Sequence, residues 1–250
     1  MPDVVPAAVP DPARRADGTE VSVDALLFDA GGVLIVPDPL AVRQQLEPFG
    51  VSPGDARCIR AHYAGMAAQA AASADVDDWP AYRRAVARAC GVDDAAVDDA
   101  ADALGRLFSP FLWRRPLLES VAALWRLHRA GVPIGVVSNA SGQVEATLAH
   151  QGVCQVGPGG GVPVACVVDS EVVGVAKPDP AIFAPALATI GLPAHRVGYV
   201  GDSVRNDVGG ARAAGMVPFL LDPHDDHDAI GCIRIRSLHD LVGYLAPRPA

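Results

Sequence analysis

Three aspartates follow apolar segments, where a carboxylate can do chemistry. Asp29 comes directly after the apolar run Ala25–Phe28, and Asp202 and Asp207 follow a second run, Val197–Val200. A carboxylate can act as a covalent nucleophile, and two carboxylates five positions apart on a strand-to-helix turn offer the hard oxygen ligands that Mg²⁺ prefers. Each aspartate has an alternative interpretation as a residue that caps a turn or a helix.

A hydroxyl and a lysine occupy comparable positions elsewhere in the chain. Ser138-Asn139 follow the apolar residues Val136-Val137. A hydroxyl and backbone amides at such a junction can hold phosphate oxygens, although Ser-Asn there is also an ordinary helix N-cap. Lys177 precedes Pro178, which disfavours helix at the lysine, and its ammonium could neutralise a carboxylate and a phosphoryl group in transfer.

Apolar runs alternate with helix-period segments from Val23 onward. The predicted strands are Val23–Phe28, Val132–Val137, Val164–Val168, Val197–Val200 and Val217–Leu221. Near-continuous apolar runs are typical of parallel strands buried on both faces. The pattern predicts an α/β protein with a doubly wound, Rossmann-like parallel sheet. Because such sheets bind ligands at the carboxyl ends of their strands, we expect the residues above to converge there.

The stretch 38–115 differs from the rest because it contains no convincing strand. Its four predicted helical segments are Pro39–Phe49, Pro53–Ala72, Trp79–Cys90 and Asp93–Leu107. We therefore expect an α-helical cap over residues 38–115, seated on a core of residues 21–37 and 116–250. Residues 1–20, rich in Pro, Ala and Asp, predict a disordered tail.

The ordered set of motifs resembles that of the haloacid dehalogenase-like (HAD) hydrolases, over about residues 23–222. The string Lys177-Pro178-Asp179-Pro180-Ala181-Ile182-Phe183 is especially specific, and a helical insert after the first motif is typical of the phosphoglycolate phosphatase-like subclass. The resemblance implies that Asp29 forms an aspartyl-phosphate and that Lys177 assists it. It implies phosphate binding by Gly31, Gly32, Ser138, Asn139 and Lys177, and Mg²⁺ binding by Asp29, Gly31, Asp202 and Asp207.

Gly31 departs from the family pattern, since most phosphatases of this superfamily carry a second aspartate there. In them its carbonyl binds Mg²⁺ and its side chain serves as general acid and base. Gly31 keeps the carbonyl and lacks the acid, which predicts a rate loss of about 10²–10⁴-fold that good leaving groups lessen. Asp38 and His62 are candidate replacement donors, each with an alternative structural or solvent-facing role.

Three functions fit these residues. The first is a Mg²⁺-dependent phosphatase acting on a small phosphorylated metabolite. The second is a metal-independent 2-haloacid dehalogenase, although those enzymes usually carry a bulky residue at the position of Gly31. The third is a non-catalytic, phosphate-sensing or partner-binding protein. Arg114 and Arg115, where the insert returns to the core, are candidate clamps for a substrate carboxylate or phosphate.

Composition narrows the partners and the compartment. The net charge of −9 over 250 residues argues against a nucleic-acid partner, which needs clustered Lys and Arg. Five cysteines without a Cys-x-x-Cys pair, and no recognisable signal peptide, predict reduced thiols in a cytoplasmic protein. No apolar run reaches the roughly 18–20 residues of a membrane span, so we expect no membrane partner. We expect a monomer or a homodimer.

Overall fold

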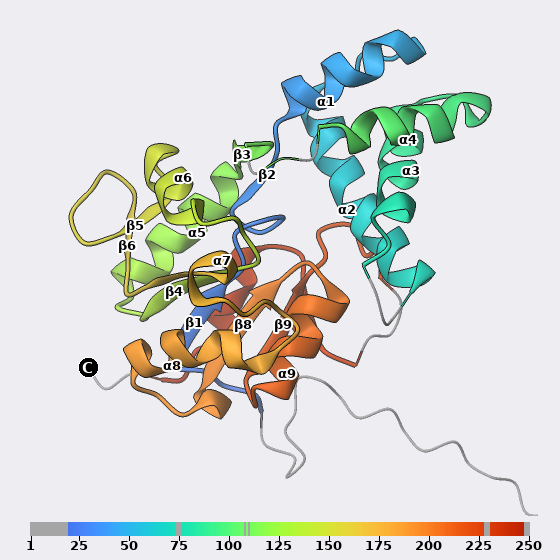
Figure 1. The fold of residues 1–250 in the computed structure, drawn as a ribbon. Coiled ribbons are helices and arrows are strands. Elements are labelled where there is room, and N and C mark those ends of the chain that lie inside the picture. The colour runs from blue at the N-terminus through green and yellow to red at the C-terminus, as the bar shows by residue number, and fades with distance from the viewer. Residues whose placement is uncertain (1–19, 74–76, 108, 110, 228–230, 248–250) are drawn as a thin grey trace, which may run out of the picture.

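The computed structural model describes residues 20–73, 77–107, 109, 111–227 and 231–247. The predicted tail thus lies outside the described residues, apart from Glu20. Six parallel strands form the central sheet, in the order β10-β9-β8-β1-β4-β7 (Figure 1). They are β1 (Ala25–Phe28), β4 (Ile134–Ser138), β7 (Val167–Asp169), β8 (Val197–Gly201), β9 (Val217–Leu221) and β10 (Ile233–Ile235). The predicted parallel α/β core is confirmed.

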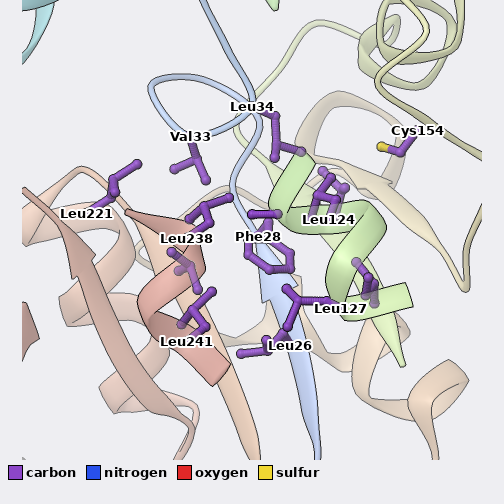
Figure 2. Packing of buried hydrophobic residues seen from close by; sticks show 14 of the residues in the cluster. Leu26, Phe28, Val33, Leu34, Leu124, Leu127, Cys154, Leu221, Leu238 and Leu241 are labelled. Carbon is purple, nitrogen blue, oxygen red and sulfur yellow. The ribbon is translucent and has the colours of Figure 1, made fainter. Parts of the chain in front are cut away.

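Helices cover both faces of this sheet. One face carries α5 (Leu118–Arg129) and α6 (Val144–His150), and the other carries α8 (Ala184–Ile190) and α9 (Gly210–Ala213). The alternation of β1 explains the two layers, because successive side chains of a strand point to opposite faces. Leu26 and Phe28 pack against α5 and the C-terminal turn Leu238–Tyr244, as Figure 2 shows, whereas Ala25 and Leu27 lie in the opposite cluster. The sheet is therefore doubly wound.

Four helices lie together beside the core in Figure 1, and we refer to them as the helical insert. They are α1 (Pro39–Leu46), α2 (Asp55–Ala72), α3 (Trp79–Cys90) and α4 (Val97–Gly105). Their buried residues form a separate hydrophobic cluster that includes Leu46, Tyr82 and Leu104. An antiparallel ribbon of β2 (Ile35–Pro37) and β3 (Trp113–Pro116) carries the chain into the insert and back. Each helical segment predicted from the sequence thus contains one of these helices.

The sequence prediction of one strand over Val164–Val168 is wrong. Two short strands lie there: β6 (Val162–Val164) pairs with β5 (Cys154–Val156), while β7 joins the central sheet beside β4. A continuous apolar run carries no mark of where the chain leaves one sheet for another. Strand β10 escaped prediction because Arg234 interrupts its apolar character and it has only three residues. The helical turn α7 (Ser170–Val173) follows β7.

The cysteines are free thiols, and the helices are short or polar. The five cysteines carry no disulfide, and all but Cys166 are buried. Among the helices of the described residues, none combines the length and apolar character needed to cross a bilayer.

Candidate active site

The strand order places three of the candidate residues at one point of the sheet. Strand β1 lies between β4 and β8, so the order along the sheet reverses direction there, and open α/β sheets bind ligands at such a point. Asp29 follows β1, Ser138 ends β4 and Asp202 follows β8. All three line a cavity of about 400 Å³ whose wall also includes residues of the helical insert.

Lys177 lies at the centre of a buried hydrogen-bonded network. Its Nζ donates to Asp207 Oδ1 at 2.7 Å and to Tyr199 OH at 2.9 Å, and lies 3.0 Å from Asp29 Oδ1. Only 4% of Lys177 and 1% of Asp207 is exposed. An ammonium has three donors, so these partners use its full capacity. The sequence did not predict Tyr199, a buried strand residue whose hydroxyl also donates to the carbonyl of Val137 at 2.7 Å.

Asn139 holds the loop that carries this lysine. Its Nδ2 donates to the Lys177 carbonyl at 3.0 Å, and its Oδ1 accepts from the Lys177 N–H at 2.7 Å. The side chain predicted to bind phosphate is therefore engaged with the backbone of Lys177. Asn139 still lines the cavity, as does Ser138, whose hydroxyl lowers the pKa of the neighbouring Asp29 carboxyl.

The crowded carboxylates change their proton affinities. Burial raises the pKa of Asp29 to about 7; Lys177 opposes this effect, whereas Asp207 and Asp202 add to it. Burial also raises the pKa of Asp207, against the attraction of Lys177. For Lys177 itself burial favours the neutral amine, but Asp207 and Asp29 more than offset this and raise its pKa. The lysine is therefore charged at neutral pH.

Asp29, Asp202 and Asp207 have the chemistry of a cation site. Each offers a carboxylate oxygen, and these oxygens lie within 4.8 Å of one another. Three carboxylates face one ammonium, so the fully ionised cluster carries an excess of negative charge. An all-oxygen donor set suits a hard divalent cation such as Mg²⁺. The residues present therefore fit the metal that the sequence led us to expect.

His62 of α2 connects the helical insert to this cluster. Its Nε2 lies 2.9 Å from Asp202 Oδ2 and its Nδ1 lies 2.9 Å from Tyr82 OH. With the hydrogen on Nε2, the ring donates to Asp202 and leaves Nδ1 to accept from the tyrosine hydroxyl. Such a contact fixes the orientation of a ligating carboxylate. His62 is 2% exposed and is not among the residues that line the cavity, so its place is that of a positioning residue.

An indole covers the position where Gly31 lacks a side chain. A Cβ on Gly31 would lie 3.2 Å from Cζ3 and 3.3 Å from Cε3 of Trp113, the first residue of β3. That is closer than nine in ten real Cβ contacts, so the ring would have to shift by a few tenths of an ångström. Trp113 thus occupies the space next to position 31, where an acidic side chain would lie. The sequence did not indicate this role.

Gly32 is hydrogen-bonded within the protein through both its backbone groups. Its N–H donates to the Ile35 carbonyl at 2.8 Å and its carbonyl accepts from Tyr63 OH at 2.9 Å. Its φ is +70°, and a Cβ there would lie 1.8 Å from Asp202 Oδ2. Gly32 lies outside the described cavity wall, and its N–H already has a backbone partner. Gly31 does line the cavity.

The remaining candidates lie away from the described cavity wall. Arg114 pairs with Asp38, which also caps α1 by accepting from Leu40 N–H, and Arg115 lies 3.2 Å from Asp55 Oδ2. About half of each arginine side chain is exposed. The structure therefore brings neither the arginines nor Asp38 to the cluster of Asp29, Asp202, Asp207 and Lys177.

Comparisons with known proteins agree with this geometry. The haloacid dehalogenase-like hydrolases match residues 23–215. Haloacid dehalogenase-like hydrolase domain-containing protein 3 of Danio rerio is 34% identical over 149 residues, 59% of this chain and 58% of that protein. A phosphoserine phosphatase of Thermus thermophilus is 28% identical over 170 residues, 64% of this chain and 61% of that one. The matches thus span about three fifths of these relatives.

Solved structures share the fold. A putative HAD-hydrolase from Bacillus subtilis, bound to magnesium, superposes with a TM-score of 0.57 at 18% identity, over 90% of this chain and 99% of that one. A dehalogenase in an intermediate complex gives 0.53 at 17% identity, over 91% and 99%. At such identities the likeness concerns the fold alone, and it does not separate phosphatases from dehalogenases. By the match over residues 23–215 and the convergence of its motifs, the chain belongs to the haloacid dehalogenase-like hydrolases.

Proposed function

We propose that this hydrolase is a Mg²⁺-dependent phosphatase of small phosphorylated metabolites that works through an aspartyl-phosphate on Asp29. The observation that carries the proposal is the buried ammonium of Lys177 between Asp29 and Asp207, with Asp202 completing a three-carboxylate cluster. A dehalogenase needs one nucleophilic carboxylate, whereas three clustered carboxylates have a direct use as ligands of a divalent cation. The phosphatase name of one relative agrees with this choice. The helical insert then serves as the cap.

The reaction has two steps at phosphorus. An oxygen of Asp29 attacks, and the bond between phosphorus and the leaving oxygen breaks with its electron pair remaining on that oxygen. Water then attacks phosphorus, the bond to Asp29 breaks, and inorganic phosphate and the free carboxylate result. Lys177 holds Asp29 in place and offsets negative charge, while Ser138 lies beside the reacting carboxylate. Mg²⁺ bound by Asp29, Asp202 and Asp207 would supply further charge neutralisation.

The described cavity wall provides no obvious proton donor for the leaving oxygen. Its ionisable side chains are Asp29, Asp202, Asp207 and Lys177, all members of the catalytic cluster. Leaving groups that depart as stable anions avoid this need. We therefore expect turnover of acetyl phosphate and para-nitrophenyl phosphate to exceed that of a simple alkyl phosphate by about 10²-fold or more.

This expectation is tested by steady-state assays of the three compounds with Mg²⁺ and with a chelator. We expect Mg²⁺-dependent phosphate release that is faster from acetyl phosphate and para-nitrophenyl phosphate than from the alkyl phosphate. Absence of turnover for every phosphate would overturn the proposal, and metal-independent halide release from 2-haloacids would replace it with dehalogenation.

Mg²⁺ should stabilise the protein more strongly at higher pH. The folded pKa of Asp29, about 7, lies above its ordinary value of 3.8. In metal-free protein its contribution to stability is therefore fully present below the ordinary value and is lost as pH rises through about 7. Because a metal binds the deprotonated carboxylate, the rise in Tm on adding Mg²⁺ should be larger near about pH 8 than near about pH 6. Thermal melts with Mg²⁺ and with chelator measure this difference, and Asp29→Asn should reduce it.

A further inference from the structure

The cavity wall outside the catalytic cluster is uncharged. It combines large apolar side chains from both parts of the molecule with neutral polar ones. The apolar members are Ile35, Met66, Trp79, Trp113 and Val144, and the polar members include Gln69, Gln143, Thr147 and Asn206. Two indoles and a thioether suit a flat or apolar group.

This wall offers no cation to a second anionic group on a substrate. Lys177 is the one basic side chain among the described residues that line it, and its three donors already meet Asp29, Asp207 and Tyr199. The internal residues outside the described part, 74–76, 108, 110 and 228–230, include no Lys, Arg or His. A carboxylate entering beyond the phosphoryl group would therefore lose its hydration without a counter-charge, which is costly.

Gln69 supplies the one positive indication of a ligand. This residue of α2 is 5% exposed, lines the cavity, and its Nε2 has no hydrogen-bond partner. An amide donor buried without a partner is destabilising, and such groups in native proteins call for an explanation. A substrate atom that accepts a hydrogen bond would satisfy it.

We infer that the leaving group of the substrate is uncharged, largely apolar or aromatic, and carries a hydrogen-bond acceptor that Gln69 binds. The inference rests on the proposed phosphatase function and names its substrate class. It excludes phosphate esters that carry a carboxylate, such as phosphoserine, from efficient use. The indoles of Trp79 and Trp113 flank the body of the leaving group, while the catalytic cluster holds the phosphoryl end.

The charge requirement is tested on the unmodified protein with a matched pair of aryl phosphates. We expect the KM of para-carboxyphenyl phosphate to exceed that of its methyl ester by about tenfold or more, because the ester carries no charge beyond its phosphoryl group. Equal KM values, or a lower KM for the carboxylate, would overturn the inference. If no phosphate, including acetyl phosphate, is turned over with Mg²⁺, the proposed function itself fails instead.

The role of Gln69 is tested with Gln69→Leu, which removes the donor at similar volume. KM for the methyl ester should rise by about tenfold, whereas KM for para-propylphenyl phosphate, which lacks an acceptor on its side group, should rise far less. Gln69→Met provides a second apolar variant, and melting curves check that both fold. Equal changes for the two aryl phosphates, or no change for the ester, would contradict a hydrogen bond from Gln69.

Discussion

Asp29→Asn should lower kcat for acetyl phosphate and para-nitrophenyl phosphate on the order of 10⁴-fold or more, as loss of a covalent nucleophile does. The amide cannot form the aspartyl-phosphate, although its oxygen can still accept from Lys177. The variant should remain folded, since Asp29 is crowded by Asp202 and Asp207 and burial already disfavours its charge. Removing that charge relieves repulsion.

Steady-state kinetics with Mg²⁺ and a melting curve in chelator measure both effects. The expected result is an inactive protein whose Tm equals or exceeds that of the parent. Activity within tenfold of the parent would remove Asp29 from the role of nucleophile.

Gly31→Asp should increase turnover of simple alkyl phosphates by about 10²-fold or more, since it supplies the general acid that the first motif lacks. Acetyl phosphate should gain little, because its leaving group needs no proton. The indole of Trp113 limits the gain, as a Cβ at position 31 would lie 3.2 Å from its Cζ3. The double variant Gly31→Asp/Trp113→Phe should therefore exceed the single one.

Gly31→Asn is the matched control, since it places a side chain of the same shape at this position without an ionisable group. Assays of all three variants on one alkyl phosphate and on acetyl phosphate separate chemistry from packing. An equal gain with Asn, or no gain in the double variant, would mean that proton transfer does not limit the reaction.

Much of the fold followed from the sequence because its signals are local. Apolar runs mark β1, β4, β8 and β9, and segments without a convincing strand pattern mark the helices of the insert. Strands β5, β6 and β10 have three residues each, too few for a periodic pattern to emerge. Their pairing depends on distant segments that the local sequence does not specify.

The catalytic cluster was predictable for a related reason. Parallel strands deliver the residues at their carboxyl ends to one edge, so Asp29, Ser138 and Asp202 had to meet once the strands were placed. The contribution of the insert was not predictable in the same way. In the sequence, nothing distinguishes Tyr199, Trp113 and Gln69 from ordinary core or helix residues. Only the packing of the insert on the core brings Trp113 and Gln69 to the cavity.

The structure also shows which parts of the site depend on a side chain at position 31. The cluster of three carboxylates and the contact between Lys177 and Asp29 form without a side chain at position 31, and the neighbouring space holds an aromatic ring. His62 reaches the cluster from the insert, but it contacts Asp202 and Tyr82 and does not line the described cavity wall. We therefore expect phosphoryl transfer to Asp29 to be retained, with a rate that depends strongly on how stable the leaving group is as an anion.

Covalent labelling of Asp29 is the most direct test of the proposed aspartyl-phosphate. The protein is mixed with acetyl phosphate and Mg²⁺, quenched rapidly in acid, digested and analysed by peptide mass spectrometry, with Asp29→Asn treated in parallel. We expect the added mass of one phosphoryl group on the peptide that contains Asp29, dependent on Mg²⁺ and absent from the variant. Turnover without any such adduct, or an adduct that persists in Asp29→Asn, would contradict it.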